Sequence, residues 1–372
     1  MAKFEPTRLS AALHRRGMTQ REIADHCGVT SQYISMFERG EKEPPAEMIN
    51  KIASVLRFPE QFFFGSPVEL IPVNAVSFRA KRSMTSSTRD QGIGTSAIAV
   101  GIVNVDLETR FRLPKADVPD LSEHTPEEAA AILRARWQLG YDPIQNMVHL
   151  LEARGVRVYW IHNNSPSLDA FMFWRDTKPF VMLNSLKTAG DRARFDAAHE
   201  LGHLILHRHT KSLDTKKVED EANKFASAFL LPRETFEREC PDHPELSLLY
   251  QLKRKWKVSV SAMVMRGAQL GIFTEWQTRQ AFQLLNTSGE RLREKVPVAR
   301  EQSKLHPMVF DALGKNAITP ATYAQMLTLE VDELKEIMPV ADEYLKTEDV
   351  TPPSLPTVER RKGHLRVIPG GR

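Results

Sequence analysis

One short segment, His199-Glu200-Leu201-Gly202-His203, restricts the possible folds of this chain more than any other. Its two histidines are four residues apart, so on a helix they lie on one face and both can reach one metal ion. The surrounding stretch, 191–208, has the apolar periodicity of a core helix, where an unpartnered pair of imidazoles would be costly. Glu200 is placed to act as general base toward a metal-bound water, whose pKa zinc lowers to roughly 7. We therefore expect a zinc site with His199 and His203 as ligands and Glu200 as the catalytic residue.

Such a site needs a third protein ligand. The metzincin pattern, a glycine and then a histidine shortly after the second ligand, fails because Leu206 and His207 follow instead. The next helix, predicted over 218–231, is the better source. Its small Ala222 allows that helix to pack closely against a neighbour.

Glu219 and Asn223 share one face of this second helix because they are four residues apart. The helix resembles the third-ligand helix of gluzincins, which implies that Glu219 binds zinc and that Asn223 orients a ligand by a hydrogen bond. Glu221 is the competing ligand candidate and is interpreted as a solvated charge. His207 and His209 are interpreted as structural or solvated side chains.

Three short runs rich in aromatic and β-branched residues precede the histidine helix and predict a small sheet: 156–161, 169–174 and 178–183. Residues 83–153 have a mostly helical pattern with a break around 113–126. After that break, Thr125 can cap a helix in which Pro126 occupies the first position.

Two stretches, NSLKTAGDRARFDAAHELGH and EDEANKFASAFLLP, resemble the ImmA/IrrE family of metallopeptidases together with the strands before them. The resemblance covers 150–235 and in part 70–290, where Phe78-Arg79-Ala80 matches the connector of fused members. It implies a gluzincin-like enzyme with a protein substrate. Several family members cleave a DNA-binding repressor and so derepress mobile-element or stress genes. A sheet edge such as 169–174 could hold an extended substrate by strand addition.

The N-terminal segment 18–40 carries the signals of two short helices joined by a tight turn. Thr19 caps the first helix, and Glu22 completes a capping box. Gly28 supplies the turn, and Thr30 caps the second helix, whose apolar residues lie on one face. The pattern predicts a helix-turn-helix.

The second helix leaves polar side chains at its exposed N-terminal end, where a recognition helix reads base edges in the major groove. Gln20 could bind a phosphate at a helix N-terminus, and Arg39 and Lys42 are candidate backbone contacts. The expected DNA-binding residues are Gln20, Thr30, Ser31, Gln32, Tyr33, Ser35, Arg39 and Lys42. TQREIA, the turn glycine, IS and ERGEKEP resemble the XRE-type, or Cro/cI-like, helix-turn-helix over about residues 5–64. That resemblance implies a double-stranded DNA operator and a homodimer on two half-sites.

Composition is compatible with this interpretation. The chain has 372 residues, enough for two or three domains, with 41% hydrophobic residues, 26% charged residues and a net charge of +4. Its two cysteines, Cys27 and Cys240, are far apart, which argues against a disulfide framework and fits a reducing cytosol. No stretch approaches ~18 uninterrupted apolar residues, so we expect a cytoplasmic protein with no membrane partner.

We expect a mainly α fold with a small β-sheet (α+β), divided into five parts. They are a five-helix helix-turn-helix bundle (1–65), a connector (66–82), a gluzincin-like minimal zincin domain (83–240, core 150–235), a helical C-terminal region (241–350) and a disordered tail (351–372).

Residues 248–277 in the C-terminal region have the pattern of helix, turn, helix. Lys253, Arg254, Lys257 and Arg266 give this unit a basic side. It is either a second helix-turn-helix or a helical cover that closes the peptidase core.

Three functions fit these motifs. The first is a transcriptional regulator with proteolytic output, in which Glu200 activates water to cleave a repressor, a toxin partner or the chain's own linker. It would control stress, mobile-element or toxin-antitoxin genes. The second is non-enzymatic: a repressor or antitoxin whose zinc domain is a sensor or a structural module. The third is a sensor that binds single-stranded DNA or a small ligand after the sheet.

Overall fold

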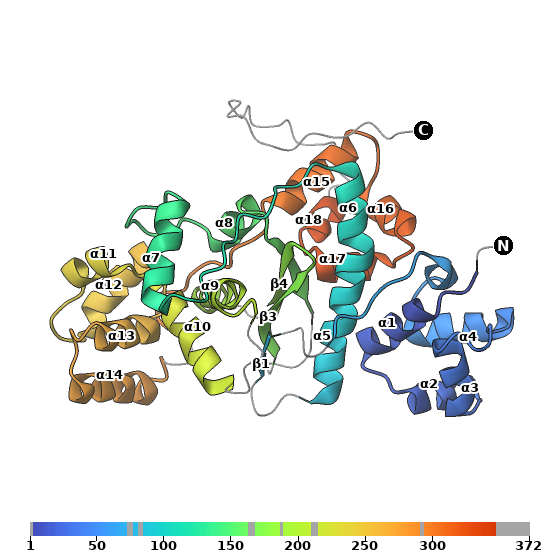
Figure 1. The fold of residues 1–372 in the computed structure, drawn as a ribbon, viewed down its shortest axis with the longest axis horizontal. Coiled ribbons are helices and arrows are strands. Elements are labelled where there is room, and N and C mark those ends of the chain that lie inside the picture. The colour runs from blue at the N-terminus through green and yellow to red at the C-terminus, as the bar shows by residue number, and fades with distance from the viewer. Residues whose placement is uncertain are drawn as a thin grey trace.

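The computed structural model describes residues 3–72, 77–80, 85–162, 168–186, 189–209, 215–290 and 294–346. The tail predicted to be disordered lies outside them. Figure 1 shows helices arranged around one small sheet, with the N-terminal helices at one end of the molecule. None of the described helices is long and apolar enough to cross a bilayer.

The N-terminal helices are α1 (Pro6–Arg16), α2 (Gln20–Cys27), α3 (Ser31–Glu38), α4 (Ala46–Leu56) and the 3-10 helix η1 (Glu60–Phe64). In the described part of the chain, the expected five-helix bundle thus consists of four α-helices and one 3-10 helix. The helix signals act as predicted. Thr19 and Glu22 form a capping box at the start of α2, and Gly28 ends α2 with a φ of 71°. Thr30 caps α3 by accepting a hydrogen bond from the Tyr33 N–H.

A long helical rod follows, made of α5 (Ser86–Ile98), the π-helical segment η3 (Ala99–Asn104) and α6 (Val105–Arg110). Gly94 lies where α5 crosses α1, and a Cβ atom there would be 2.1 Å from the Arg15 backbone nitrogen. The absence of a side chain therefore allows the rod to contact the first helix of the N-terminal bundle directly.

The sheet has four strands: β1 (Ser77–Ala80), β2 (Arg157–Ile161), β3 (Leu168–Arg175) and β4 (Lys178–Asn184), in the order β1-β3-β4-β2. The three predicted strands are present. Strand β1, from the connector, pairs antiparallel with β3 and places Phe78 opposite Phe171. Our expectation that 169–174 offers a free edge is therefore wrong, because β3 has a neighbour on both sides.

Two groups of helices flank the sheet. The first is α7 (Pro126–Arg136), α8 (Met147–Ala153), α9 (Gly190–Leu206), α10 (Thr215–Leu230), α11 (Arg233–Glu239), α12 (Leu246–Trp256), α13 (Val260–Gln269) and α14 (Glu275–Thr287). The second is α15 (Leu305–Gly314), α16 (Pro320–Met326), α17 (Val331–Ile337) and α18 (Ala341–Lys346). As predicted, Thr125 and Glu128 form a capping box at the start of α7, with Pro126 in its first turn.

Each face of the sheet belongs to a different hydrophobic core. Val158 and Trp160 of β2 lie in the core formed with α7–α14. Tyr159 and Ile161 face the opposite way and share a core with α1–α4, η1, the α5–α6 rod and α15–α18. The alternation follows from the two-residue period of a strand. The N-terminal bundle is thereby joined to the sheet through a continuous apolar core.

Helices α12 and α13 have fewer exposed cations than the sequence indicated. Lys253 is 1% exposed and pairs with Asp191 at 2.6 Å. Arg266 is also 1% exposed and pairs with Glu127 at 2.6 Å. The predicted basic side of this unit therefore loses two of its charges, because the Lys253 ammonium and the Arg266 guanidinium are both buried.

Candidate metal centre and DNA-reading helix

The candidate metal centre lies between α9 and α10, which are held close by small residues. A Cβ at Gly202 would be 3.3 Å from the Ala222 Cα, so glycine at one position and alanine at the other set the spacing. His199 and His203 lie on the α9 side of this contact and are completely buried, as is Glu200.

Three side chains converge there. The Nε2 atoms of His199 and His203 are 3.0 Å apart. The two carboxylate oxygens of Glu219 on α10 contact one nitrogen each, Oε2 at 3.3 Å from His199 and Oε1 at 3.3 Å from His203. The ligand atoms of the three residues all lie within 4.8 Å of one another. The structure thus brings together the three residues that the sequence proposed as ligands.

The spacing of these atoms fits a zinc ion. Tetrahedral zinc with bonds of about 2.0–2.1 Å separates neighbouring ligand atoms by roughly 3.3 Å. The observed separations are 3.0 Å and, twice, 3.3 Å. Two buried imidazole nitrogens and a carboxylate facing one point are a donor set that suits a cation of borderline softness.

The outer nitrogens of both histidines are also engaged. Asn223 on α10 offers its side-chain oxygen to the Nδ1 of His199 at 3.0 Å. An amide oxygen can only accept, so His199 carries its hydrogen on Nδ1 and leaves the lone pair of Nε2 for a metal. Asn223 therefore occupies the orienting position expected from the sequence.

His203 has a different partner, which the sequence interpretation missed. Its Nδ1 is 3.0 Å from Nδ1 of His207, whose Nε2 is 3.1 Å from an oxygen of Glu221. His207 is 7% exposed, so it is neither solvated nor distant from the site. The only sequence signal was the four-residue step from His203 to His207, which repeats the step from His199 to His203.

The surroundings of Glu219 and His207 set the protonation state of each side chain. Burial disfavours ionisation of Glu219, but the adjacent imidazoles of His199 and His203 outweigh that effect and hold the pKa of its carboxyl well below the ordinary value. Burial lowers the pKa of His207 and outweighs the hydrogen bond to Glu221. Glu219 is therefore ionised and His207 neutral near pH 7.

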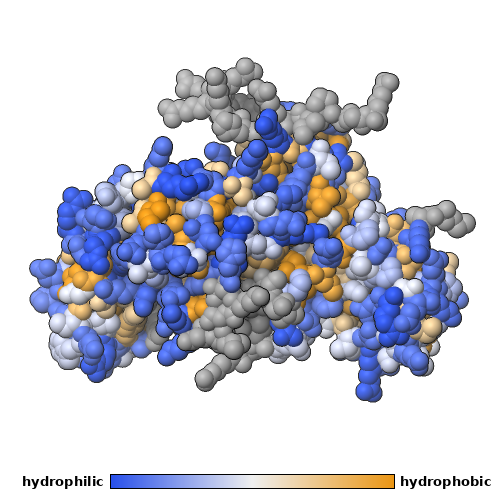
Figure 2. All heavy atoms as spheres, viewed as in Figure 1, coloured by the Kyte–Doolittle hydropathy of each residue, from blue (hydrophilic) through white to orange (hydrophobic). Residues whose placement is uncertain are grey.

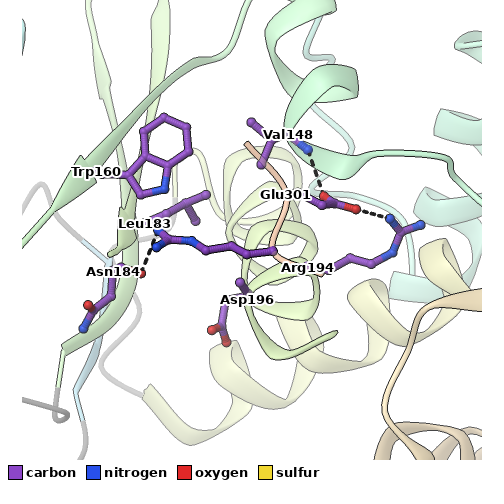
Figure 3. Close-up of a pocket in the computed structure, with 9 residues that line it drawn as sticks. Val148, Trp160, Leu183, Asn184, Arg194, Asp196 and Glu301 are labelled. Atoms are coloured by element: carbon purple, nitrogen blue, oxygen red, sulfur yellow. Dashed lines mark hydrogen bonds and ion pairs between the residues drawn. The ribbon is translucent and has the colours of Figure 1, made fainter. Parts of the chain in front are cut away.

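The N-terminal half of α9 is fixed from the opposite side. Figure 3 shows Arg194 of α9 paired with Glu301, which also accepts a hydrogen bond from the Val148 N–H. Arg300, next in the chain, donates a hydrogen bond to the Asn184 carbonyl at the end of β4. The segment that precedes α15 thereby ties α8, α9 and β4 together, which holds the histidine helix in place.

The predicted DNA-reading residues lie on α3 and beside it. Ile34 and Phe37 are fully buried and fix α3 in the bundle. Thr30, Ser31 and Gln32 are exposed at its N-terminal end, whereas Tyr33 and Ser35 are half-buried. The face of this bundle seen in Figure 2 carries mostly hydrophilic side chains.

Three of the expected DNA contacts already have partners within the bundle. Gln20 donates a hydrogen bond to Glu38 at 2.6 Å. Arg39 pairs with Glu41 at 2.7 Å, and the Lys42 ammonium lies 4.7 Å from the centre of the Tyr33 ring. These side chains are positioned beside α3 but must exchange partners to reach a phosphate.

Comparison with known proteins supports both parts of this arrangement. Residues 9–63 match the helix-turn-helix family, and residues 151–267 match the IrrE N-terminal-like domain. The chain joins an XRE-type helix-turn-helix to an IrrE/ImmA-type domain of the M78 peptidase family. Both resemblances seen in the sequence are confirmed.

Relatives among characterised proteins include the transcriptional regulator ClgR of Mycobacterium tuberculosis, from the CDC 1551 / Oshkosh and ATCC 25618 / H37Rv strains. Each is 39% identical to this chain over 51 residues. The aligned stretch spans 14% of this chain and about half, 46%, of each relative. It therefore informs on one domain of each protein.

Proposed function

We propose that the chain is a DNA-binding transcriptional regulator whose second domain is a zinc metallopeptidase. The observation that carries the proposal is the convergence of His199, His203 and Glu219 at separations suited to tetrahedral zinc. The M78 family to which this domain belongs consists in general of zinc metallopeptidases. The three side chains are the proposed ligands, and Asn223 orients His199 through its Nδ1.

Zinc bound at this site would polarise a peptide carbonyl and make a water molecule acidic near neutral pH. Glu200, fully buried next to the first ligand in α9, is the proposed general base. Its carboxylate accepts a proton from the attacking water and returns it to the amine that leaves. The low dielectric around the buried carboxylate strengthens its interaction with developing charge.

The proposed substrate is a protein segment in extended conformation, and strand β1 supports this. Ser77–Ala80 of the connector pairs with β3, and β3 packs against α9, the helix that carries both histidines. The pairing of β1 with β3 supports the proposal, because β1 is an extended segment bound at the side of β3 where a substrate would lie. A partner repressor or toxin would have to displace β1, whereas self-cleavage would use the connector itself.

The proposed DNA ligand is a double-stranded operator read by α3 in the major groove. The exposed Thr30, Ser31 and Gln32 support this role, because recognition helices contact base edges with the residues of their first turns. A homodimer on two half-sites is part of the proposal, since one small helix-turn-helix makes few phosphate contacts.

A second function is supported by the shared core. The N-terminal bundle shares a hydrophobic core with one face of the sheet, and α9 and α10 share a core with its other face. Metal binding could therefore change DNA affinity through the sheet without any cleavage. In this alternative the zinc domain is a sensor or structural module of a repressor or antitoxin.

Two variants in the native host distinguish these functions. Glu200→Gln removes the base and keeps the ligands, whereas His199→Ala removes a ligand. A peptidase requires both residues, so transcript profiles of both strains should change alike and the cleaved substrate should be absent from both. If Glu200→Gln matches wild type while His199→Ala does not, the sensor function replaces the peptidase.

A further inference from the structure

We infer that His207 and Glu221 form a positioning pair for the metal ligand His203, so that the two histidine ligands are oriented by chemically different partners. The inference rests on the proposed metal site and deepens it. Neither residue belongs to the cluster of three that could hold the ion. From the sequence, Glu221 was the competing ligand candidate, interpreted as a solvated charge, and His207 was interpreted as a structural or solvated side chain.

The hydrogen positions in the series His203–His207–Glu221 follow from the metal ligand His203 at one end and the Glu221 carboxylate at the other. If Nε2 of His203 faces the metal, its hydrogen lies on Nδ1 and is donated to Nδ1 of His207 at 3.0 Å. His207 must then carry its own hydrogen on Nε2, which is 3.1 Å from Glu221. A carboxylate accepts there without conflict, so a single arrangement satisfies every atom of the pair.

Burial indicates that the arrangement is more than a surface ion pair. The side chain of His207 is 7% exposed and that of Glu221 is 32% exposed, and His207 caps the C-terminal end of α9. Exposed ion pairs usually contribute little, whereas hydrogen bonds to metal-bound histidines in buried sites fix the ring and raise its basicity. On the solvent side, the Lys217 ammonium lies 3.8 Å from the other carboxylate oxygen of Glu221 and forms an ion pair with it.

The consequence is an asymmetric site. His199 is held by the neutral amide of Asn223, and His203 is held by an imidazole that itself donates to a carboxylate. Helix α10 supplies three of the side chains at this site within five residues: Glu219, Glu221 and Asn223. A shift of α10 would therefore disturb the Asn223 bond to His199 and the Glu221 bond to His207 together.

The test measures zinc affinity of the full-length protein by competition with a chromophoric chelator. His207→Leu preserves bulk and removes the acceptor, and we expect its affinity to fall by about 10–100-fold. His207→Asn keeps an oxygen near the position of Nδ1 and should recover most of the affinity. A space-filling role predicts the reverse order, because leucine fills the site better than asparagine.

His209→Leu is the matched control. This histidine is two residues from His207, is 71% exposed and pairs with Asp120. The zinc affinity of His209→Leu should therefore equal that of wild type. Cobalt absorption of His207→Leu should also shift, since the geometry around the ion changes. Melting of the metal-free proteins checks folding, and Glu221→Gln, with a smaller expected loss, serves if His207→Leu does not fold.

The outcomes separate two failures. Wild-type protein without zinc affinity would overturn the proposed metal site itself. Wild-type protein that binds zinc, with His207→Leu and Glu221→Gln binding equally well, would overturn only the positioning pair. Loss of one full equivalent in His207→Leu, with zinc retained in Glu219→Ala, would make His207 a ligand and also overturn the inference.

Discussion

Replacing Glu333 tests whether the DNA-binding bundle and the C-terminal helices act as one folded unit. Glu333 on α17 is 5% exposed and accepts a hydrogen bond from Arg15 of α1 at 2.8 Å. It also pairs with Arg16, while Glu336 forms a second pair with Arg15. Burial disfavours the charge on Arg15, but the two glutamates outweigh this and raise the pKa of its guanidinium.

Glu333→Gln keeps the shape and removes the charge. Breaking a buried ion pair from one side usually costs about 3–5 kcal/mol, because the remaining charge is left without compensation. Since Glu336 still pairs with Arg15, we expect the free energy of unfolding to fall by about 2–3 kcal/mol. Urea denaturation of the full chain measures it, and hydrogen exchange should show faster opening of both α1 and α17.

Asp332→Asn is the control, one residue away. Asp332 is 88% exposed and pairs with Lys335 at 3.4 Å, so its loss should change stability by under about 0.5 kcal/mol. Equal stability of the two variants would mean that the ion pairs of Glu333 do not stabilise the contact between α1 and α17. Faster exchange confined to α17 would mean that the N-terminal bundle does not depend on this contact.

Three further changes address the sheet, the helix crossing and the DNA-reading helix. Complete burial between Tyr159 and Trp160 lowers the pKa of His306 to about 3. Below pH 6.5, His306 is therefore protonated in the unfolded chain but stays neutral in the folded chain. The free energy of unfolding consequently decreases as pH falls. Between pH 7 and 5 wild type should lose about 2 kcal/mol more than His306→Phe in chemical denaturation. Gly94→Ala should destabilise by about 1–3 kcal/mol in the same assay because its Cβ would overlap the backbone of α1; unchanged stability would mean that the crossing is looser than described. Gln32→Ala should weaken binding to operator fragments selected from the host genome by about 1–3 kcal/mol, with an unchanged melting temperature. Unchanged affinity would exclude Gln32 from base readout.

Local signals in the sequence were enough to predict the helices that carry function. Thr19 and Glu22, and likewise Thr125 and Glu128, act within four residues of each other, so their capping boxes could be recognised without knowledge of the fold. The same holds for His199 and His203, which share a helical face by spacing alone. The third ligand needed a resemblance, because Glu219 approaches only when α10 packs on α9.

Long-range contacts account for what the sequence did not predict. Strand β1 pairs with β3 across more than ninety residues of intervening chain, by the register that joins Ser77 to Met172. The sequence predicts a solvent-facing cation at Lys253, whereas in the structure this side chain is buried and pairs with Asp191, sixty-two residues earlier in the chain. Glu221 likewise gained a role only through His207. Each case depends on a partner that local periodicity does not specify.

The most direct test of the proposed zinc site is the zinc content of the purified full-length protein after dialysis against a mild chelator, for wild type beside Glu219→Ala. We expect close to one zinc per chain in wild type and loss of that zinc in the variant, since Glu219 contacts both histidines. Zinc retained by Glu219→Ala would contradict the ligand set. Absence of zinc from both proteins would contradict the proposal that the second domain is a zinc metallopeptidase.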